Sequence, residues 1–192
     1  MKIRFYFFIL ITMSSLSLSA QHEIGFKAGY TRSSATIPND KFYIGDLGGR
    51  GNDWFKWSSG FQAGISAHMD VGSDFFNLDL APQYSIYGFE TEDYKIGLDY
   101  LDFDIGLSNR INRDSGQIFG SFGVTPSLLI ASKNISDAND FDLKAYLLIG
   151  YRISESVSVY AQGRFGFIEL IPESEINNVQ LSLNLEVSIF EL

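Results

Sequence analysis

The sequence predicts an all-β protein, an eight-stranded antiparallel up-and-down transmembrane β-barrel. Three observations predict this fold. Apolar residues alternate with polar or small ones at a period of two in eight successive runs, the connections between the runs are alternately long and short, and the ionisable residues of the runs lie almost entirely on one face. The composition agrees, since 17 Phe, 10 Tyr and 18 Gly in 192 residues favour strands.

The alternation is clear from the first run, in which Ile24, Phe26 and Tyr30 are separated by Gly25 and Lys27 among others. Several runs reach the roughly 9 to 11 residues that a tilted strand needs to cross a membrane. Pro82 and Pro126 interrupt two runs, and because proline has no backbone N–H we expect a bulge or a strand end at each. The eight runs cover residues 24–30, 61–69, 76–86, 101–107, 118–130, 143–151, 157–167 and 179–189.

The connections between these runs indicate an up-and-down barrel. Every second connection in such a barrel emerges at the same end, and outer-membrane barrels have short periplasmic turns and long extracellular loops. An even number of strands also places both chain ends in the periplasm. The long stretch 32–57 has room for two more strands, which leaves a ten-stranded barrel as an alternative. The long connections are 32–57, 88–97, 131–140 and 169–176, and the short ones are 70–74, 112–116 and 154–155.

The two faces of the runs differ in charge, and this difference favours a membrane barrel. A soluble barrel has an apolar interior and a polar exterior, whereas a membrane barrel has the reverse. We therefore expect the apolar face to contact lipid; a soluble ligand carrier is the alternative. Because side chains fill the interior of an eight-stranded barrel, the ionisable residues are predicted to neutralise one another there. They are Lys27, His68, Asp79, Asp102, Asp104, Arg110, Lys144, Arg152, Arg164 and Glu186.

The N-terminus has the pattern of a cleaved export signal. Lys2 and Arg4 precede an apolar run from Phe5 to Met13, and small residues follow up to Ala20. That run is too short to span a bilayer as a helix. We predict a signal peptide over residues 1–20 and an outer-membrane barrel domain over 21–192.

Composition excludes several functions. With 14 basic and 23 acidic residues the net charge is −9, which argues against a nucleic-acid partner. The chain has no cysteine, so disulfides and thiolate metal sites are excluded. The acidic segment 137–142 lacks the glycine and distal glutamate of a calcium loop, and no cofactor or metal is predicted.

A lipid-ester hydrolase needs a histidine base at the membrane surface, but the two histidines, His22 and His68, are predicted near the periplasm. We expect no enzymatic activity.

Aromatic residues gather in the first long connection and suggest two roles. Trp and Tyr form girdles at the membrane–water interface, which suits Trp54, Phe55 and Trp57 just before the second run. Phe42 and Tyr43 lie further from it. We therefore favour the girdle for those three over the alternative, a recognition surface for a protein or a glycan, and leave the role of Phe42 and Tyr43 open.

Four sequence segments resemble the outer-membrane β-barrel domain proteins common in Bacteroidota, whose broader relatives include PorT-like proteins and small barrels of the OmpX and OmpA kind. The segments are Gly25–Tyr30, Gly60–Gly64, Leu80–Ser85 and Tyr100–Phe103; family members often have proline where this chain has Asp104. The resemblance implies the fold and the location, an integral protein of the outer membrane. We expect contact with lipid and lipopolysaccharide, and the extracellular loops are the place for a protein partner. The hypotheses for its role are a structural or adhesive surface protein, an accessory of secretion or envelope assembly as the PorT-like resemblance implies, and a lipid-modifying enzyme.

Overall fold

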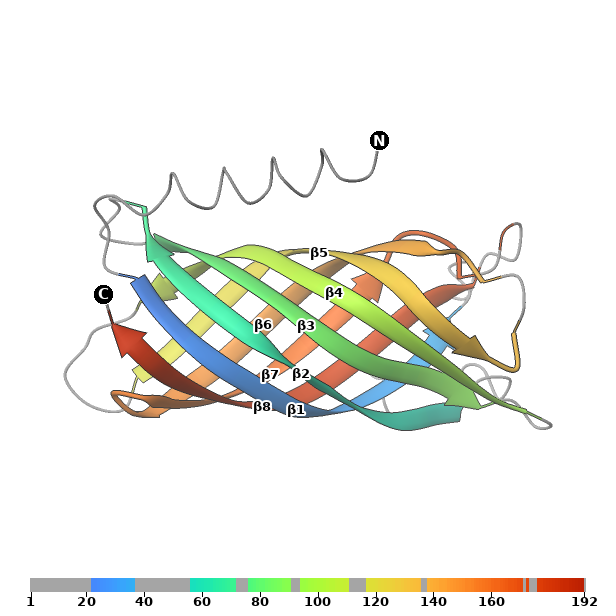
Figure 1. Cartoon of the computed structure of the whole chain (residues 1–192), viewed down its shortest axis with the longest axis horizontal. Coiled ribbons are helices and arrows are strands. Elements are labelled where there is room, and N and C mark those ends of the chain that lie inside the picture. Colours follow the sequence, from blue (N-terminus) through green and yellow to red (C-terminus); the bar gives the residue numbers. More distant parts are fainter. Residues whose placement is uncertain are drawn as a thin grey trace.

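The computed structural model describes residues 22–36, 56–71, 76–90, 94–110, 117–135, 138–170, 172 and 176–191. They form eight strands that wind around one axis (Figure 1). In these residues no helix is long and apolar enough to cross a membrane. The strands are β1 (His22–Thr36), β2 (Lys56–Asp70), β3 (Phe76–Glu90), β4 (Lys95–Arg110), β5 (Gln117–Lys133), β6 (Phe141–Ser154), β7 (Val157–Gly166) and β8 (Asn177–Glu191).

Each strand pairs antiparallel with its neighbours in sequence, and β1 pairs with β8 to close the barrel. At the closing seam Tyr30 lies opposite Phe61 of β2 on one side and Leu183 of β8 on the other. Closure gives every strand two hydrogen-bonding partners, as a lipid environment requires. The eight-stranded prediction is confirmed, and the ten-stranded alternative is wrong because the β1–β8 seam leaves no free edge for a further strand.

The two ends of the barrel differ. The chain enters β1 and leaves β8 at the end that carries the short connections, which we call the turn end (Figure 1). The opposite end, which carries the long connections, is the loop end. Strands continue beyond the predicted runs there: β1 extends to Thr36, which pairs with Asn177. The sequence hid this extension because residues 31–36 are almost all polar, so no alternation marks them.

The two prolines do not act as predicted. Pro82 and Pro126 lie within β3 and β5, opposite Phe103 and Leu143, and the register continues through both. Neither sits at a bulge or a strand end. Pairing is interrupted only on the other side of each strand, between Gly64 and Ala67 of β2 and between Asp102 and Ile105 of β4. A missing N–H therefore costs a bond to one neighbour only, and the barrel tolerates it.

Apolar side chains point outward and polar ones inward. Leu147 and Leu183 are 68% and 64% exposed, whereas Asp102 and Arg164 are 0% and 1% exposed. This distribution is the reverse of a soluble barrel, in which the apolar face is buried. It is the arrangement that lipid around the barrel would stabilise.

An apolar cluster closes over the polar interior at the loop end. We call it the apolar cap. The connections before β6 and before β8 are joined at Leu170, a member of the apolar cap, since the Asn139 amide donates to the Leu170 carbonyl (2.8 Å) and the Leu170 amide to the Ile176 carbonyl (2.6 Å). The apolar cap consists of Ala35, Tyr87, Phe89, Leu98, Tyr100 and Leu170, all buried.

Gly106 provides a test of the packing inside the barrel. A Cβ on Gly106 would overlap the Tyr146 hydroxyl and lie 2.5 Å from the carbonyl oxygen of Phe122, whereas a Cβ on Gly97 would come no closer than 3.7 Å to another residue. Gly106→Ala is expected to lower the free energy of unfolding by about 1–3 kcal/mol through overpacking. Gly97→Ala should change it by less than about 0.5 kcal/mol. Urea titration of the folded barrels measures both, and equal values would contradict this packing.

Candidate functional site

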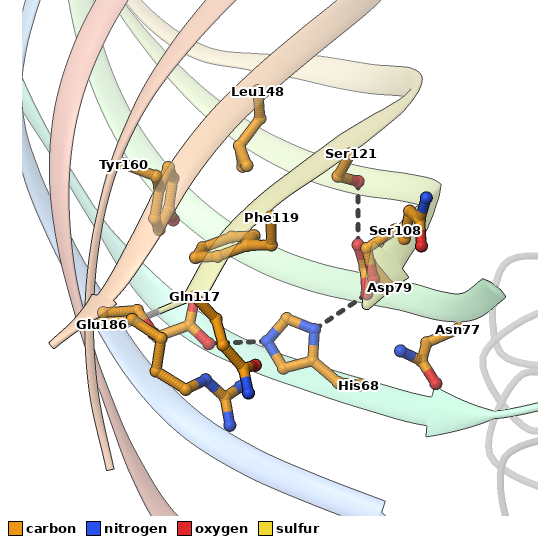
Figure 2. A pocket seen from close by; sticks show the side chains of 13 residues that line it. His68, Asn77, Asp79, Ser108, Gln117, Phe119, Ser121, Leu148, Tyr160 and Glu186 are labelled. Carbon is orange, nitrogen blue, oxygen red and sulfur yellow. Dashed lines mark hydrogen bonds and ion pairs between the residues drawn. The ribbon is translucent and has the colours of Figure 1, made fainter. Parts of the chain in front are cut away.

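Near the turn end, His68 joins three strands through an ionic cluster (Figure 2). Its Nδ1 lies 2.8 Å from Asp79 Oδ1 and its Nε2 lies 2.6 Å from Glu186 Oε1. Only the protonated imidazole can donate from both nitrogens, and both partners are carboxylates. This geometry therefore favours the positively charged ring. Asp79 also accepts hydrogen bonds from Ser108 and Ser121, both at 2.8 Å.

A second ion pair crosses the lumen at the same end. Arg152 Nη2 of β6 lies 3.1 Å from Glu23 Oε2 of β1, and Ser188 also donates to this carboxylate. Glu23 faces inward because it precedes Gly25 and Lys27 in the same alternation. Sequence reasoning missed it because the alternation was read only from Ile24 onward.

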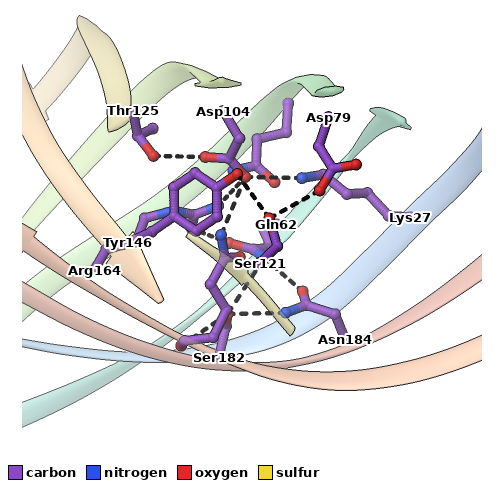
Figure 3. A network of polar contacts seen from close by, with 12 residues as sticks. Lys27, Gln62, Asp79, Asp104, Ser121, Thr125, Tyr146, Arg164, Ser182 and Asn184 are labelled. Atoms are coloured by element: carbon purple, nitrogen blue, oxygen red, sulfur yellow. Dashed lines mark hydrogen bonds and ion pairs between the residues drawn. The ribbon is translucent and has the colours of Figure 1, made fainter. Parts of the chain in front are cut away.

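Asp104 is the centre of the network in the middle of the barrel (Figure 3). Its Oδ2 lies 3.0 Å from Lys27 Nζ and 2.8 Å from Arg164 Nη2. Thr125 donates to Oδ1 at 2.6 Å, and the Gln83 and Gln162 amides donate to Oδ2. Strands β1, β3, β4, β5 and β7 thus meet at one carboxylate.

Gln62 extends this network toward the β8 wall. Arg164 Nη1 donates to Gln62 Oε1 (2.7 Å) and to Gln180 Oε1 (3.1 Å). The Gln62 amide in turn donates to Asn184 Oδ1 at 2.5 Å. The lumen at this height is filled by side chains that hydrogen-bond to one another, as the width of an eight-stranded barrel demands.

A third cluster lies directly below the apolar cap. Lys144 Nζ is 3.2 Å from Asp102 Oδ1 and 3.9 Å from Asp142 Oδ2. It also lies 4.4 Å and 4.3 Å from the ring centroids of Tyr87 and Tyr100, which belong to the apolar cap. These contacts are cation–π interactions, so the lysine links the charged interior to the apolar cap.

The ten ionisable residues predicted for the interior divide into these clusters. Eight of them are inward-facing members of the three clusters, and Arg152 is partly exposed at the turn end. Arg110 is the last residue of β4, but its side chain lies outside the described part of the structure. Asp142 was missed although it alternates with Lys144, because the sixth run was started at Leu143. Within the described residues no cluster of His, Cys, Asp or Glu could hold a metal ion.

The predicted loop aromatics are mostly not described. Phe42, Tyr43, Trp54 and Phe55 lie outside the described residues, as does the predicted signal peptide. Trp57 lies in β2, half-buried, opposite Phe89 of β3. Trp57 lies near the loop end of the barrel, a position compatible with a membrane girdle and with a recognition surface. Both roles stay predictions.

Comparison with known proteins gives the fold and nothing finer. No protein-family model matches the sequence, and no curated protein matches it. Among solved structures, Neisserial surface protein A (NspA) is similar with a TM-score of 0.50 and 14% identity, covering 86% of this chain and 97% of that protein. The outer membrane enzyme PagL has a TM-score of 0.52 and 13% identity, covering 87% and 99%. The resemblance to Bacteroidota proteins stays a prediction, and the chain has the fold of the small outer-membrane β-barrels.

Proposed function

We propose that this protein is a non-enzymatic, non-conducting barrel of the outer membrane, whose extracellular loops carry its interactions with other molecules. The turn end would face the periplasm and the loop end the exterior. The export signal predicted over residues 1–20 supports this location, as does the outward apolar face of the strands. Lipid and lipopolysaccharide would surround the barrel.

The single observation that carries this proposal is the filled and capped interior. Arg164, Lys144 and Asp104 are at most 4% exposed; Arg164 pairs with Asp104 inside the lumen, and Lys144 pairs with Asp102. The apolar cap then covers these clusters at the loop end. An ion crossing the barrel would have to break buried ion pairs, which costs several kcal/mol for each pair left unpaired.

The similarity to an enzyme does not extend to a histidine-based site in the described residues. Both ring nitrogens of His68 are engaged by carboxylates inside the barrel, so this side chain is not available as a base at the lipid surface. His22 begins β1 at the turn end, far from the loop end where an outer-leaflet lipid would be attacked. This supports a binding or structural role.

Membrane fractionation together with conductance recording tests the proposal. We expect the native protein in the outer-membrane fraction, with a mobility on an unboiled gel that shifts after boiling. The purified barrel should produce no channel events in a planar lipid bilayer. Lipid A extracted from a deletion strain should be unchanged by mass spectrometry. Stable conductance would contradict the filled lumen, altered lipid A would indicate an enzyme, and recovery in a soluble fraction would revive the soluble carrier.

A further inference from the structure

A pocket opens inside the barrel at the turn end, below the central network (Figure 2). Its volume is about 60 Å³. Residues from seven of the eight strands line it, including Asn77, Gln117, Phe119, Ser158 and Tyr160. In the middle of the barrel and near the loop end, the described side chains of the two clusters occupy the lumen, whereas this part of the lumen is left open.

The inner part of the pocket is apolar and aromatic. The rings of Phe119 and Tyr160 face each other with centroids 6.4 Å apart in an edge-to-face arrangement, and Leu148 lies beside them. The Phe119 ring is held against Gly150, where any Cβ would overlap it. These residues offer a rigid apolar surface to a ligand that enters from the turn end.

Polar side chains without partners surround this aromatic surface. Within the described residues, the side chains of Asn77, Gln117 and Ser158 form no hydrogen bond and line the pocket. A polar group that faces a pocket without a protein partner binds water or a ligand there. Single buried atoms without a partner also occur in the central network, such as Gln83 Oε1 and Gln162 Oε1, but they lie among packed side chains and do not face this pocket.

The described ionisable side chains that line the pocket are already paired. His68 is held between Asp79 and Glu186, and Arg152 is held by Glu23, which lies outside the lining. Both lining cations are thus engaged by carboxylates of the protein, which disfavours phosphate or carboxylate ligands. The free groups instead suit a neutral molecule with both donors and acceptors.

We propose that the pocket binds a neutral N-acetylated sugar unit. Its hydroxyl and acetamido groups would pair with Asn77, Gln117 and Ser158, and the apolar face of its ring would pack on Phe119 and Tyr160. The volume holds roughly four to six waters, which is about the space of one pyranose ring, so part of the acetamido group would extend toward the turn end and a longer glycan would not fit in full. In the proposed orientation this sugar comes from the periplasm, as part of the cell wall or as a free sugar.

Binding can be measured on the folded mature barrel in lipid nanodiscs with labelled leucine methyl groups. Titration with N-acetylglucosamine is expected to shift the Leu148 methyl resonances and to saturate in the millimolar range, while Leu170 in the apolar cap does not respond. Asn77→Ala or Ser158→Ala should each weaken the affinity about three- to tenfold, as the loss of one hydrogen bond does. Ser132→Ala, an exposed site at the loop end, is the matched control.

Several outcomes would overturn the assignment. If Leu148 does not respond, the pocket holds water only. If N-acetylalanine amide shifts Leu148 at lower concentration than the sugar, the ligand is a peptide. Because the titration needs no cells, it remains informative even if the proposed location in the outer membrane fails. A positive result is followed by sedimentation with purified cell-wall glycan: retention that Asn77→Ala abolishes supports a wall-bound sugar, and a response to the free sugar alone supports a soluble one.

Discussion

Replacing Asp104 with alanine is expected to cost about 3–5 kcal/mol of the free energy of unfolding, the largest effect of any single substitution considered for the barrel interior. Asp104 is the carboxylate that both Lys27 and Arg164 contact, and these two cations are 4% and 1% exposed. Without it, two buried positive charges lose the one carboxylate that both of them contact. Asp104→Asn should be nearly as damaging, because it keeps the size of the side chain and removes the charge.

Denaturant titration of barrels refolded in detergent or lipid measures this loss, with the boiled and unboiled gel as a check of folding. Asp140→Ala is the matched control, because Asp140 is an exposed aspartate between β5 and β6 with no ion pair among the described residues. Its change should stay within about 0.5 kcal/mol. If Asp104→Ala costs less than about 1 kcal/mol, water already shields the cluster and the lumen is not tightly filled.

Replacing Leu183 with arginine is expected to destabilise the barrel by about 2–4 kcal/mol in a lipid bilayer. Leu183 lies in the middle of β8 and is 64% exposed on the outer face. At that depth the surrounding solvent would be hydrocarbon, in which a guanidinium is poorly solvated. The same substitution in a soluble protein would be nearly neutral at so exposed a position.

The depth dependence of this effect provides its control. Ile189 lies on the same strand and the same face, close to the turn end, and is 44% exposed. Ile189→Arg should cost only about 0–1 kcal/mol, since an arginine there reaches the interface. Equal costs at the two positions, measured by reversible unfolding from lipid vesicles, would mean that the outer face does not lie in a membrane.

The strands and their two faces could be predicted from the sequence because lipid contact is a local property. Leu181, Leu183 and Leu185 all lie on the outer face of β8, where each side chain would contact lipid, so every second residue of the strand is apolar. Beyond the apolar band of the barrel, the outward side chains no longer need to be apolar, and the alternation disappears. The ends of β1 and β3 were assigned to loops, although backbone pairing continues to Thr36 and Glu90.

Partnerships inside the lumen could not be predicted in the same way. Alternation placed Lys27 and Asp104 on the inner face, but they are 77 residues apart and meet only because the barrel closes with this register. Glu23 and Arg152 are separated by 129 residues and meet across the lumen for the same reason. The apolar cap was also hidden, since Leu170 joins Leu98 and Tyr100 through connections that look polar in the sequence.

The sequence by itself determined the fold class, the number of strands and which face of each strand is apolar, because every second residue of a strand meets the same surroundings. The tertiary structure alone decided which charges pair, where the lumen is sealed and where it stays open as a pocket. Those features depend on the closing of β1 onto β8, which fixes the height of each inward side chain relative to the other seven strands.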